Sequence, residues 1–336
     1  MKILVTGATG RIGSRLVAEL LRQNHEVRAL VMPADPLRTR IEGPGVEIVE
    51  GQLTERDSLH PAVEGVDAVY HLGAHLPQGR TSDEIFATNV VGTYNLLESL
   101  VPHASRISRF VLASTDNVYW NPNGALYLPV DEQHPRINDD PYGMSKILCE
   151  DMCWNYMRRC GLPVTIPRFG VTLACDELLD STSIWADKLY LAGFLKLLKS
   201  KPVLSPEEQE TVENLEDLDP RDPRLVIAYD TQGVVGTEMV NDPRNLAEGL
   251  LLLLEKEIAV GKVFHLMAAQ PFAHDQLLRY ISKVTGWPYV EVTVSKVVNW
   301  ELSIAKARAM LGYNPTKDVF QMVDEGWALR SEGKTP

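Results

Sequence analysis

The chain has 336 residues, of which 45% are hydrophobic and 23% are charged, an ordinary composition for a globular protein. Its formal net charge of -12 at pH 7 repels phosphate backbones and anionic membrane surfaces, so neither nucleic acid nor a membrane is an expected partner. No apolar run approaches the ~20 residues that span a bilayer. The four cysteines show no repeated CxxC pattern, which indicates reduced thiols, no metal site and a cytoplasmic location.

Short β-branched runs alternate with longer helical patterns through the first half of the chain. Strands that alternate with helices pair in parallel, through right-handed crossovers. The pattern predicts an α/β fold, namely a Rossmann-type doubly wound parallel sheet with a smaller mixed α/β region toward the C-terminus. The expected strands are 3–6, 26–31, 46–50, 68–72, 110–113 and 164–166, and the expected helices are 12–22, 85–100 and 141–160.

The alternation ends after Arg168, and the segment 205–224 is rich in proline and acid. We interpret this segment as a solvated surface loop, with a mobile lid over a substrate pocket as the alternative. Beyond it, the expected elements are helices at 243–255, 274–285, 300–311 and 319–329 and a strand at 262–266.

Part of this second half is expected to return to the main sheet. The predicted dinucleotide-binding domain is 1–170, with 234–267 returning to it. The predicted substrate-binding region is 171–233 with 268–336.

The first predicted strand runs directly into Thr6-Gly-Ala-Thr-Gly-Arg-Ile-Gly13, a TGxxGxxG pattern. Gly7 permits a tight turn, Gly10 lets the backbone approach a pyrophosphate, and Gly13 lets the following helix pack closely on the sheet. The free N–H groups at that helix N-terminus favour an anion. This position between a strand and a helix predicts a dinucleotide site. The expected contacts are Gly7, Thr9, Gly10, Arg11, Ile12 and Gly13.

The choice between NAD and NADP depends on the end of the second strand. An acid there would hold the ribose hydroxyls of NAD, but the strand ends at Met32 without one. Asp35 follows shortly, and Arg38 and Arg40 lie beyond it. The cofactor is therefore NAD or NADP, with a slight preference for NADP through Arg38.

A YxxxK pattern, Tyr142 to Lys146, opens the helix expected at 141–160. Residues four apart share a helix face, so the ammonium can stabilise a tyrosinate and lower the phenol pKa from its usual ~10. The tyrosine can then exchange a proton with a substrate oxygen while hydride moves at the adjacent carbon. Ser114 and Thr115, at the end of the fifth strand, could hydrogen-bond the same oxygen.

These motifs, in this order, resemble the extended short-chain dehydrogenases/reductases of the NAD-dependent epimerase/dehydratase family. The resemblance implies that Tyr142 is the acid/base, that Lys146 binds the nicotinamide ribose, and that Thr115, or Ser114 in its place, is the third catalytic residue. It also implies a supporting role for Asn89 and a homodimer formed through the helices that carry Asn89 and Tyr142. Further cofactor contacts implied by the family are Leu53, Leu72, Gly73 and Ala74.

Three departures from the family pattern restrict the chemistry. Asn117 stands where dehydratases of the family have an acid, and an amide cannot act as a base, so we predict no dehydration. Val171 replaces an asparagine that often contacts a nucleotide diphosphate, which argues against a nucleotide-sugar substrate. Gln52 replaces an aspartate near the adenine contact.

The primary interpretation is reversible hydride transfer between NAD(P) and a secondary alcohol or carbonyl of a sugar-like small molecule. An epimerase with tightly held NAD is the alternative, and a non-catalytic dinucleotide sensor is a third. His71 and His75 lack a third ligand in the sequence, so we do not interpret them as a metal site.

Overall fold

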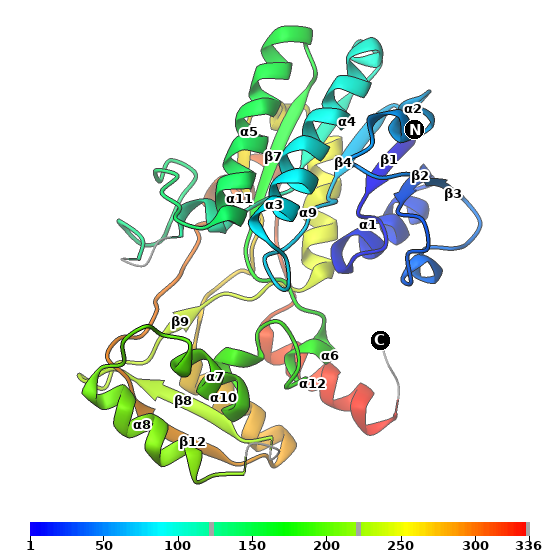
Figure 1. Cartoon of the computed structure of the whole chain (residues 1–336). Helices are drawn as coiled ribbons and strands as arrows, with labels where there is room; N and C mark the ends of the chain where they lie inside the picture. Colours follow the sequence, from blue (N-terminus) through cyan, green and yellow to red (C-terminus); the bar gives the residue numbers. More distant parts are fainter. Residues whose placement is uncertain (121–123, 220–222, 334–336) are drawn as a thin grey trace. The chain divides into compact units, whose positions relative to one another are not determined.

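The chain folds into two compact units (Figure 1). The structure is a computed structural model and describes residues 1–120, 124–219 and 223–333. Unit 1 comprises Met1–Gly170, Pro243–Met267 and Leu302–Pro315, and unit 2 comprises the remaining segments Val171–Asp242, Ala268–Glu301 and Thr316–Pro336.

These boundaries correct two expectations. The returning segment begins at Pro243 rather than at 234, and 302–315, which was expected in the smaller region, belongs to unit 1. The reason is tertiary: the Tyr313 hydroxyl donates to the Met267 carbonyl at 3.1 Å, and Lys306 Nζ donates to the Val263 carbonyl at 2.7 Å. None of these contacts is local in sequence.

The centre of unit 1 is a parallel sheet in the order β10-β7-β5-β4-β1-β2-β3, with β6 also paired to β7. The fold-class prediction is confirmed. The order reverses between β1 and β4, and ligands of such sheets bind at the carboxyl ends of the strands on either side of that point. The strands are β1 (Lys2–Thr6), β2 (Glu26–Val31), β3 (Val46–Glu50), β4 (Ala68–His71), β5 (Arg109–Leu112), β6 (Ser114–Thr115), β7 (Val164–Phe169) and β10 (Val263–His265).

Helices cover both faces of this sheet, with α1 against α9 on one face and α2, α4 and α5 packed in turn on the other (Figure 1). A core of buried apolar side chains, among them Leu4, Phe110, Leu96 and Cys153, joins the strands to α4 and α5. The helices are α1 (Arg11–Arg22), α2 (Arg56–Val63), α3 (Ser82–Ile85), α4 (Gly92–Leu100), α5 (Pro141–Cys160), α9 (Pro243–Glu255) and α11 (Ala305–Leu311).

Unit 2 is a smaller mixed assembly with its own apolar cores. Strands β8 and β12 pair in parallel, and β9 pairs with β11 in antiparallel fashion. Its elements are α6 (Cys175–Leu178), α7 (Leu191–Lys199), α8 (Pro206–Glu216), β8 (Leu225–Tyr229), β9 (Thr237–Glu238), β11 (Phe272–Ala273), α10 (His274–Thr285), β12 (Tyr289–Thr293) and α12 (Val319–Ser331).

The segment 205–224 is not the loop that we expected, because α8 occupies most of it. Ser205 and Glu208 form a capping box at its N-terminus, and Pro206 begins the helix. Thr211 and Leu215 are buried, so the helix has an inward face. Positions 220–222 of the segment lie outside the described residues.

None of the helices in the described ranges combines the length and apolarity needed to cross a bilayer.

Candidate active site

The glycine loop turns sharply between β1 and α1. Gly7 has φ +67°, a region that favours glycine, and a Cβ there would lie 2.8 Å from the Gly73 nitrogen. A Cβ on Gly13 would lie 2.1 Å from the Gly7 carbonyl oxygen, so the helix could not pack so closely with any other residue. The Gly10 N–H donates to the Gly7 carbonyl at 3.1 Å, which closes the turn. The backbone thus forms the close approach that a diphosphate requires.

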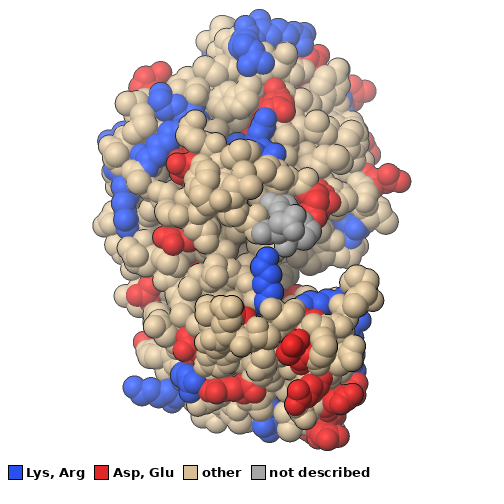
Figure 2. All heavy atoms as spheres, turned by 90° about the vertical axis from the view of Figure 1, so that its left-hand side faces the viewer, with Lys and Arg blue, Asp and Glu red and all other residues tan. Residues whose placement is uncertain are grey.

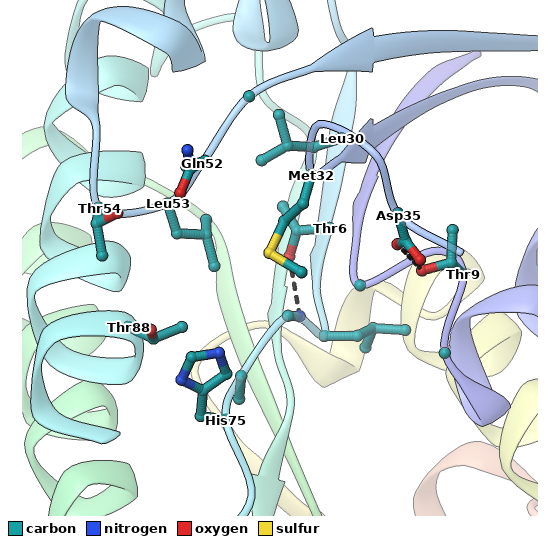
Figure 3. Close-up of a pocket in the computed structure, with 16 residues that line it drawn as sticks. Thr6, Thr9, Leu30, Met32, Asp35, Gln52, Leu53, Thr54, His75 and Thr88 are labelled. Carbon is teal, nitrogen blue, oxygen red and sulfur yellow. Dashed lines mark hydrogen bonds between the residues drawn. The ribbon is translucent and has the colours of Figure 1, made fainter. Parts of the chain in front are cut away.

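A cavity of about 300 Å³ opens beside this loop, at the carboxyl ends of β1, β2, β3 and β4 (Figure 3). Of the predicted cofactor contacts, those on its wall are Gly7, Thr9, Gly10, Leu53, Leu72, Gly73 and Ala74. Arg11, Ile12 and Gly13 belong to the first turns of α1 behind the loop. The wall also contains residues that the sequence analysis did not assign to it, namely Thr6, Leu30, Met32, Asp35, Gly51, Gln52, Thr54, His75 and Thr88. Most of these follow strand ends, a signal that could have identified them.

Asp35, rather than Arg38, faces the cavity. The Thr9 hydroxyl donates to the Asp35 carboxylate at 2.7 Å, and both residues line the wall (Figure 3). Arg38 instead donates to Glu42 at 2.9 Å and to Glu50 at 2.7 Å, and both hydrogen bonds are exposed. The placement of these two residues favours NAD over NADP, because the Asp35 carboxylate at the cavity suits ribose hydroxyls and repels a ribose phosphate.

Helix α5 holds the predicted acid/base pair. Asp140 caps the helix by accepting from the N–H groups of Tyr142 at 2.8 Å and Gly143 at 3.0 Å. Lys146 is buried and donates through Nζ to the Ala113 carbonyl at 2.9 Å, and its Nζ lies 5.9 Å from the centroid of the Tyr142 ring. The helix therefore brings the phenol and the ammonium to the end of β5.

The pKa of Tyr142 moves in the direction opposite to our expectation. Burial around the phenol raises this pKa, and the Asp116 and Asp140 carboxylates raise it further, whereas a hydrogen bond with the Thr115 side chain lowers it. Burial also lowers the pKa of Lys146, whose ammonium is directed to Ala113 rather than to the ring. The protein alone therefore keeps the Tyr142 phenol protonated at neutral pH.

The structure separates the two candidate hydroxyls at the end of β5. Thr115 forms a side-chain hydrogen bond with Tyr142. Ser114 points away and donates to the buried Glu150 carboxylate at 2.5 Å. Ser114 is therefore not available as a stand-in for Thr115.

A buried ion pair lies one turn beyond Lys146 on α5. Glu150 accepts from Arg168 Nε at 2.8 Å and from its terminal nitrogen at 2.5 Å, and Arg136 approaches the same carboxylate at 3.3 Å. Arg168 also donates to the Tyr119 hydroxyl at 2.5 Å. Burial lowers the pKa of Lys146, and the charge of Glu150 offsets part of that effect. The sequence analysis missed this pair, because its members come from different elements.

Asn89 lies in a π-helical stretch, Phe86–Val91, between α3 and α4, so the single helix expected at 85–100 is interrupted. Its side chain accepts from the His75 N–H at 2.8 Å, and donates to the His75 carbonyl at 3.0 Å and to Ser145 Oγ at 3.0 Å. Asn89 thereby ties the cavity wall to the catalytic helix. This arrangement fits the supporting role expected of it.

Residues 3–173 match the model of the NAD dependent epimerase/dehydratase family. The chain is 33% identical to the L-arabinose 1-dehydrogenase (NAD(P)(+)) of Haloferax volcanii over 53% of this chain and 70% of that protein. It is 31% identical to the uronate dehydrogenase of Pseudomonas syringae pv. tomato over 55% of this chain and 64% of that protein, so the alignment spans less than two thirds of that relative.

The structure resembles a short-chain dehydrogenase/reductase superfamily protein from Agrobacterium tumefaciens, crystallised with bound NAD. The TM-score is 0.85 and the sequences are 32% identical, over 99% of this chain and 98% of that one.

Proposed function

The chain belongs to the NAD-dependent epimerase/dehydratase family, and we propose that it is a dehydrogenase that transfers hydride reversibly at a secondary alcohol or carbonyl of a sugar-like small molecule. The observation that carries this proposal is the convergence of Tyr142, Lys146 and Thr115 at the end of β5, in the same unit as a cavity built on the glycine loop. The family assignment made from the sequence is confirmed, as is the prediction of a nicotinamide-dependent enzyme.

The cofactor is NAD or NADP, and the glycine loop suits its diphosphate because Gly7 and Gly10 line the cavity and have no side chain to keep the anion from the backbone. When bound, the dinucleotide supplies or accepts the hydride. The protonated phenol of Tyr142 donates its proton to the substrate oxygen in the direction of reduction, and Thr115 hydrogen-bonds the same oxygen. One N–H of the Lys146 ammonium donates to the Ala113 carbonyl, and the other two would be available to the ribose hydroxyls of the bound dinucleotide.

The substrate proposal is a sugar or sugar acid without a nucleotide. It is supported by the two relatives named for sugar and uronate oxidation and by Val171, which offers a diphosphate no hydrogen bond. We assign substrate selection to unit 2, which contains Val171. Asn117 donates to Asp140 at 2.7 Å, and as an amide it provides no base, so dehydration is not part of this proposal.

An epimerase with retained NAD is the second candidate, since the family description names epimerases. The test is a screen of NAD and NADP against sugars, sugar acids and nucleotide sugars, following absorbance of the reduced nicotinamide. The expected result is net reduction of NAD or NADP in the presence of a sugar or sugar acid. Cofactor retained through purification, with a change of sugar configuration and no net reduction, would favour the epimerase. Dinucleotide binding with no turnover on any substrate would favour the sensor.

We further propose a homodimer through α4, α5 and the π-helical stretch between α3 and α4. Their outward faces expose large apolar side chains, namely Phe86, Val91, Tyr94, Met144 and Leu148. Apolar groups gathered on neighbouring helices are typical of a subunit interface. Light scattering should give twice the chain mass of 37.5 kDa, and a charged residue at Tyr94 should give monomers.

The same proposal places the enzyme in the cytoplasm, supported by the free thiols of Cys149, Cys153 and Cys160. It includes neither nucleic acid nor a membrane as a partner. Acidic and basic side chains are interspersed on the face drawn in Figure 2, in keeping with the net charge of -12. Such a mixed surface does not attract a polyanion.

A further inference from the structure

His71, the last residue of β4, lies between the cofactor cavity and the π-helical stretch that carries Asn89. Its Nδ1 is 2.8 Å from the Thr6 hydroxyl, and its Nε2 is 2.9 Å from the Thr93 hydroxyl. All three side chains are buried. The imidazole therefore bridges two hydroxyls that come from β1 and α4.

The direction of each hydrogen bond follows from the donors available. The Thr93 hydroxyl donates to the Asn89 carbonyl at 2.5 Å, so it must accept at its contact with His71. His71 therefore carries its proton on Nε2. Nδ1 is bare and accepts from Thr6, whose oxygen in turn accepts from the Gly73 N–H at 3.0 Å. One continuous chain of donors runs from Gly73 to Asn89.

Only a neutral imidazole completes this chain, because the cation would have a proton on both nitrogens. Burial, with the nearby Lys146 charge, lowers the pKa of His71 to about 3. The ring is therefore neutral throughout the physiological range, and the polarity of the chain does not change with pH.

Both ends of the chain reach the proposed machinery. Thr6 and Gly73 line the cofactor cavity. At the other end, the side chain of Asn89 donates to Ser145 Oγ, and Ser145 donates to the Tyr142 carbonyl at 2.7 Å. Cys149, one turn further along α5, donates to the Asn89 carbonyl at 3.2 Å. The π-helical backbone at Asn89 is of a kind that occurs frequently at functional sites.

We propose that His71 is a positioning residue that couples occupancy of the cofactor cavity to the catalytic helix, through Thr93 and Asn89. It contacts neither the substrate nor the reacting atoms. A dinucleotide that orders Gly73 also orders Thr6, His71 and Thr93, and so holds Asn89 against α5. This inference rests on the proposed function, because it takes the cavity as the dinucleotide site.

The test compares His71→Phe, which removes both hydrogen bonds, with His71→Gln, which keeps one donor and one acceptor. Hydrogen exchange with and without NAD reports on the glycine loop and on the first turns of α5. In the wild type, NAD should protect both segments. In His71→Phe, protection should persist in the loop and fall in α5 to what the direct contact of Lys146 with the dinucleotide supplies, and the dissociation constant for NADH should rise about tenfold, the loss expected for about two hydrogen bonds. His71→Gln should stay within about threefold of the wild type.

His134→Phe is the matched control, because His134 is also buried in unit 1 and bonds through both ring nitrogens, to Leu126 and Pro135. It should lower the melting temperature and leave the protection of α5 unchanged. If His71→Phe does not fold, Thr93→Val removes the same link with little change of shape and should show the same loss of coupling.

The outcomes separate the two proposals. Protection of α5 by NAD to the wild-type extent in both His71→Phe and Thr93→Val would overturn the coupling and leave the dehydrogenase proposal intact. A wild-type protein that binds neither NAD nor NADP would overturn both.

Discussion

The two units bury charge in different ways. In unit 1, Glu150 and Arg168 are almost completely buried, and their polar atoms are satisfied by protein groups. In unit 2, Glu238 is paired with Lys188 and with His274, at 2.9 Å from the latter, on the wall of a cavity of about 220 Å³. The Lys188 side chain keeps 33% of its surface exposed.

This difference separates charges that fix geometry from charges that can respond to solvent. A carboxylate shielded from water depends wholly on its partners, so removing one partner is costly. A carboxylate beside a cavity can recruit water or a ligand instead. We therefore expect substitutions in unit 1 to affect catalysis or global stability strongly, and matched substitutions in unit 2 to have smaller effects.

The largest expected contrast comes from removing one tyrosine hydroxyl in each unit. Tyr142→Phe removes the proposed proton donor and should lower kcat by about 10²- to 10⁴-fold, with NADH binding retained. Tyr190→Phe removes a buried hydroxyl that donates to Leu178 at 3.2 Å in unit 2, and should cost about 1 kcal/mol of stability without lowering kcat. Steady-state kinetics and thermal melts measure both, and near wild-type turnover in Tyr142→Phe would exclude it as the acid/base.

The second contrast compares the two buried carboxylates. Glu150→Gln leaves Arg168 without a counter-charge and should lower the free energy of unfolding by about 3–5 kcal/mol. Glu238→Gln should cost roughly half of that or less, because Lys188 can be solvated from the cavity. Urea denaturation gives both values, and a larger loss in Glu238→Gln would reverse the comparison between the units.

A third prediction concerns the cofactor side of unit 1. Asp35→Ala should raise the dissociation constant for NAD about tenfold, because a charge-assisted hydrogen bond is lost. The dissociation constant for NADP should change less. Arg38→Ala should leave both constants within about twofold, because its guanidinium is held by Glu42 and Glu50. Fluorescence titration with both reduced cofactors measures these dissociation constants. Selectively weaker binding of the phosphorylated cofactor in Arg38→Ala would support the preference for NADP through Arg38.

The fourth prediction is a difference in acid sensitivity between the two units. The pKa of His71 is about 3 in the folded protein, below its usual 6.5, so the unfolded state binds more protons between these values. The stability of unit 1 therefore falls as pH drops below 6.5, by about 2 kcal/mol at pH 5 for this histidine. The pKa of Glu238 is lowered to about 2, because Lys188 and His274 outweigh its burial, so its contribution is lost only as pH falls below 4.5.

Urea unfolding of the wild type and His71→Gln at pH 7 and pH 5 checks this difference. The variant should lose about 2 kcal/mol less between the two values. An identical pH dependence in both proteins would mean that His71 is not held neutral by the fold.

The sequence by itself determined the features that depend on neighbouring residues. The glycine loop and the YxxxK pair act within a turn or two of the chain, so their pattern predicts their structure. The alternation of strands and helices likewise predicted the parallel sheet and the return of a later segment to it, although the pairing of β10 with β7 is seen only in the structure.

The tertiary structure alone decided which of these residues face one another. It turned Arg38 toward Glu42 and Glu50, directed Ser114 to Glu150 rather than to the reaction, and raised the pKa of Tyr142 by burial. These outcomes depend on the distance and desolvation of groups far apart in the chain. Sequence spacing contains neither quantity, so the residues could be named in advance while their partners could not.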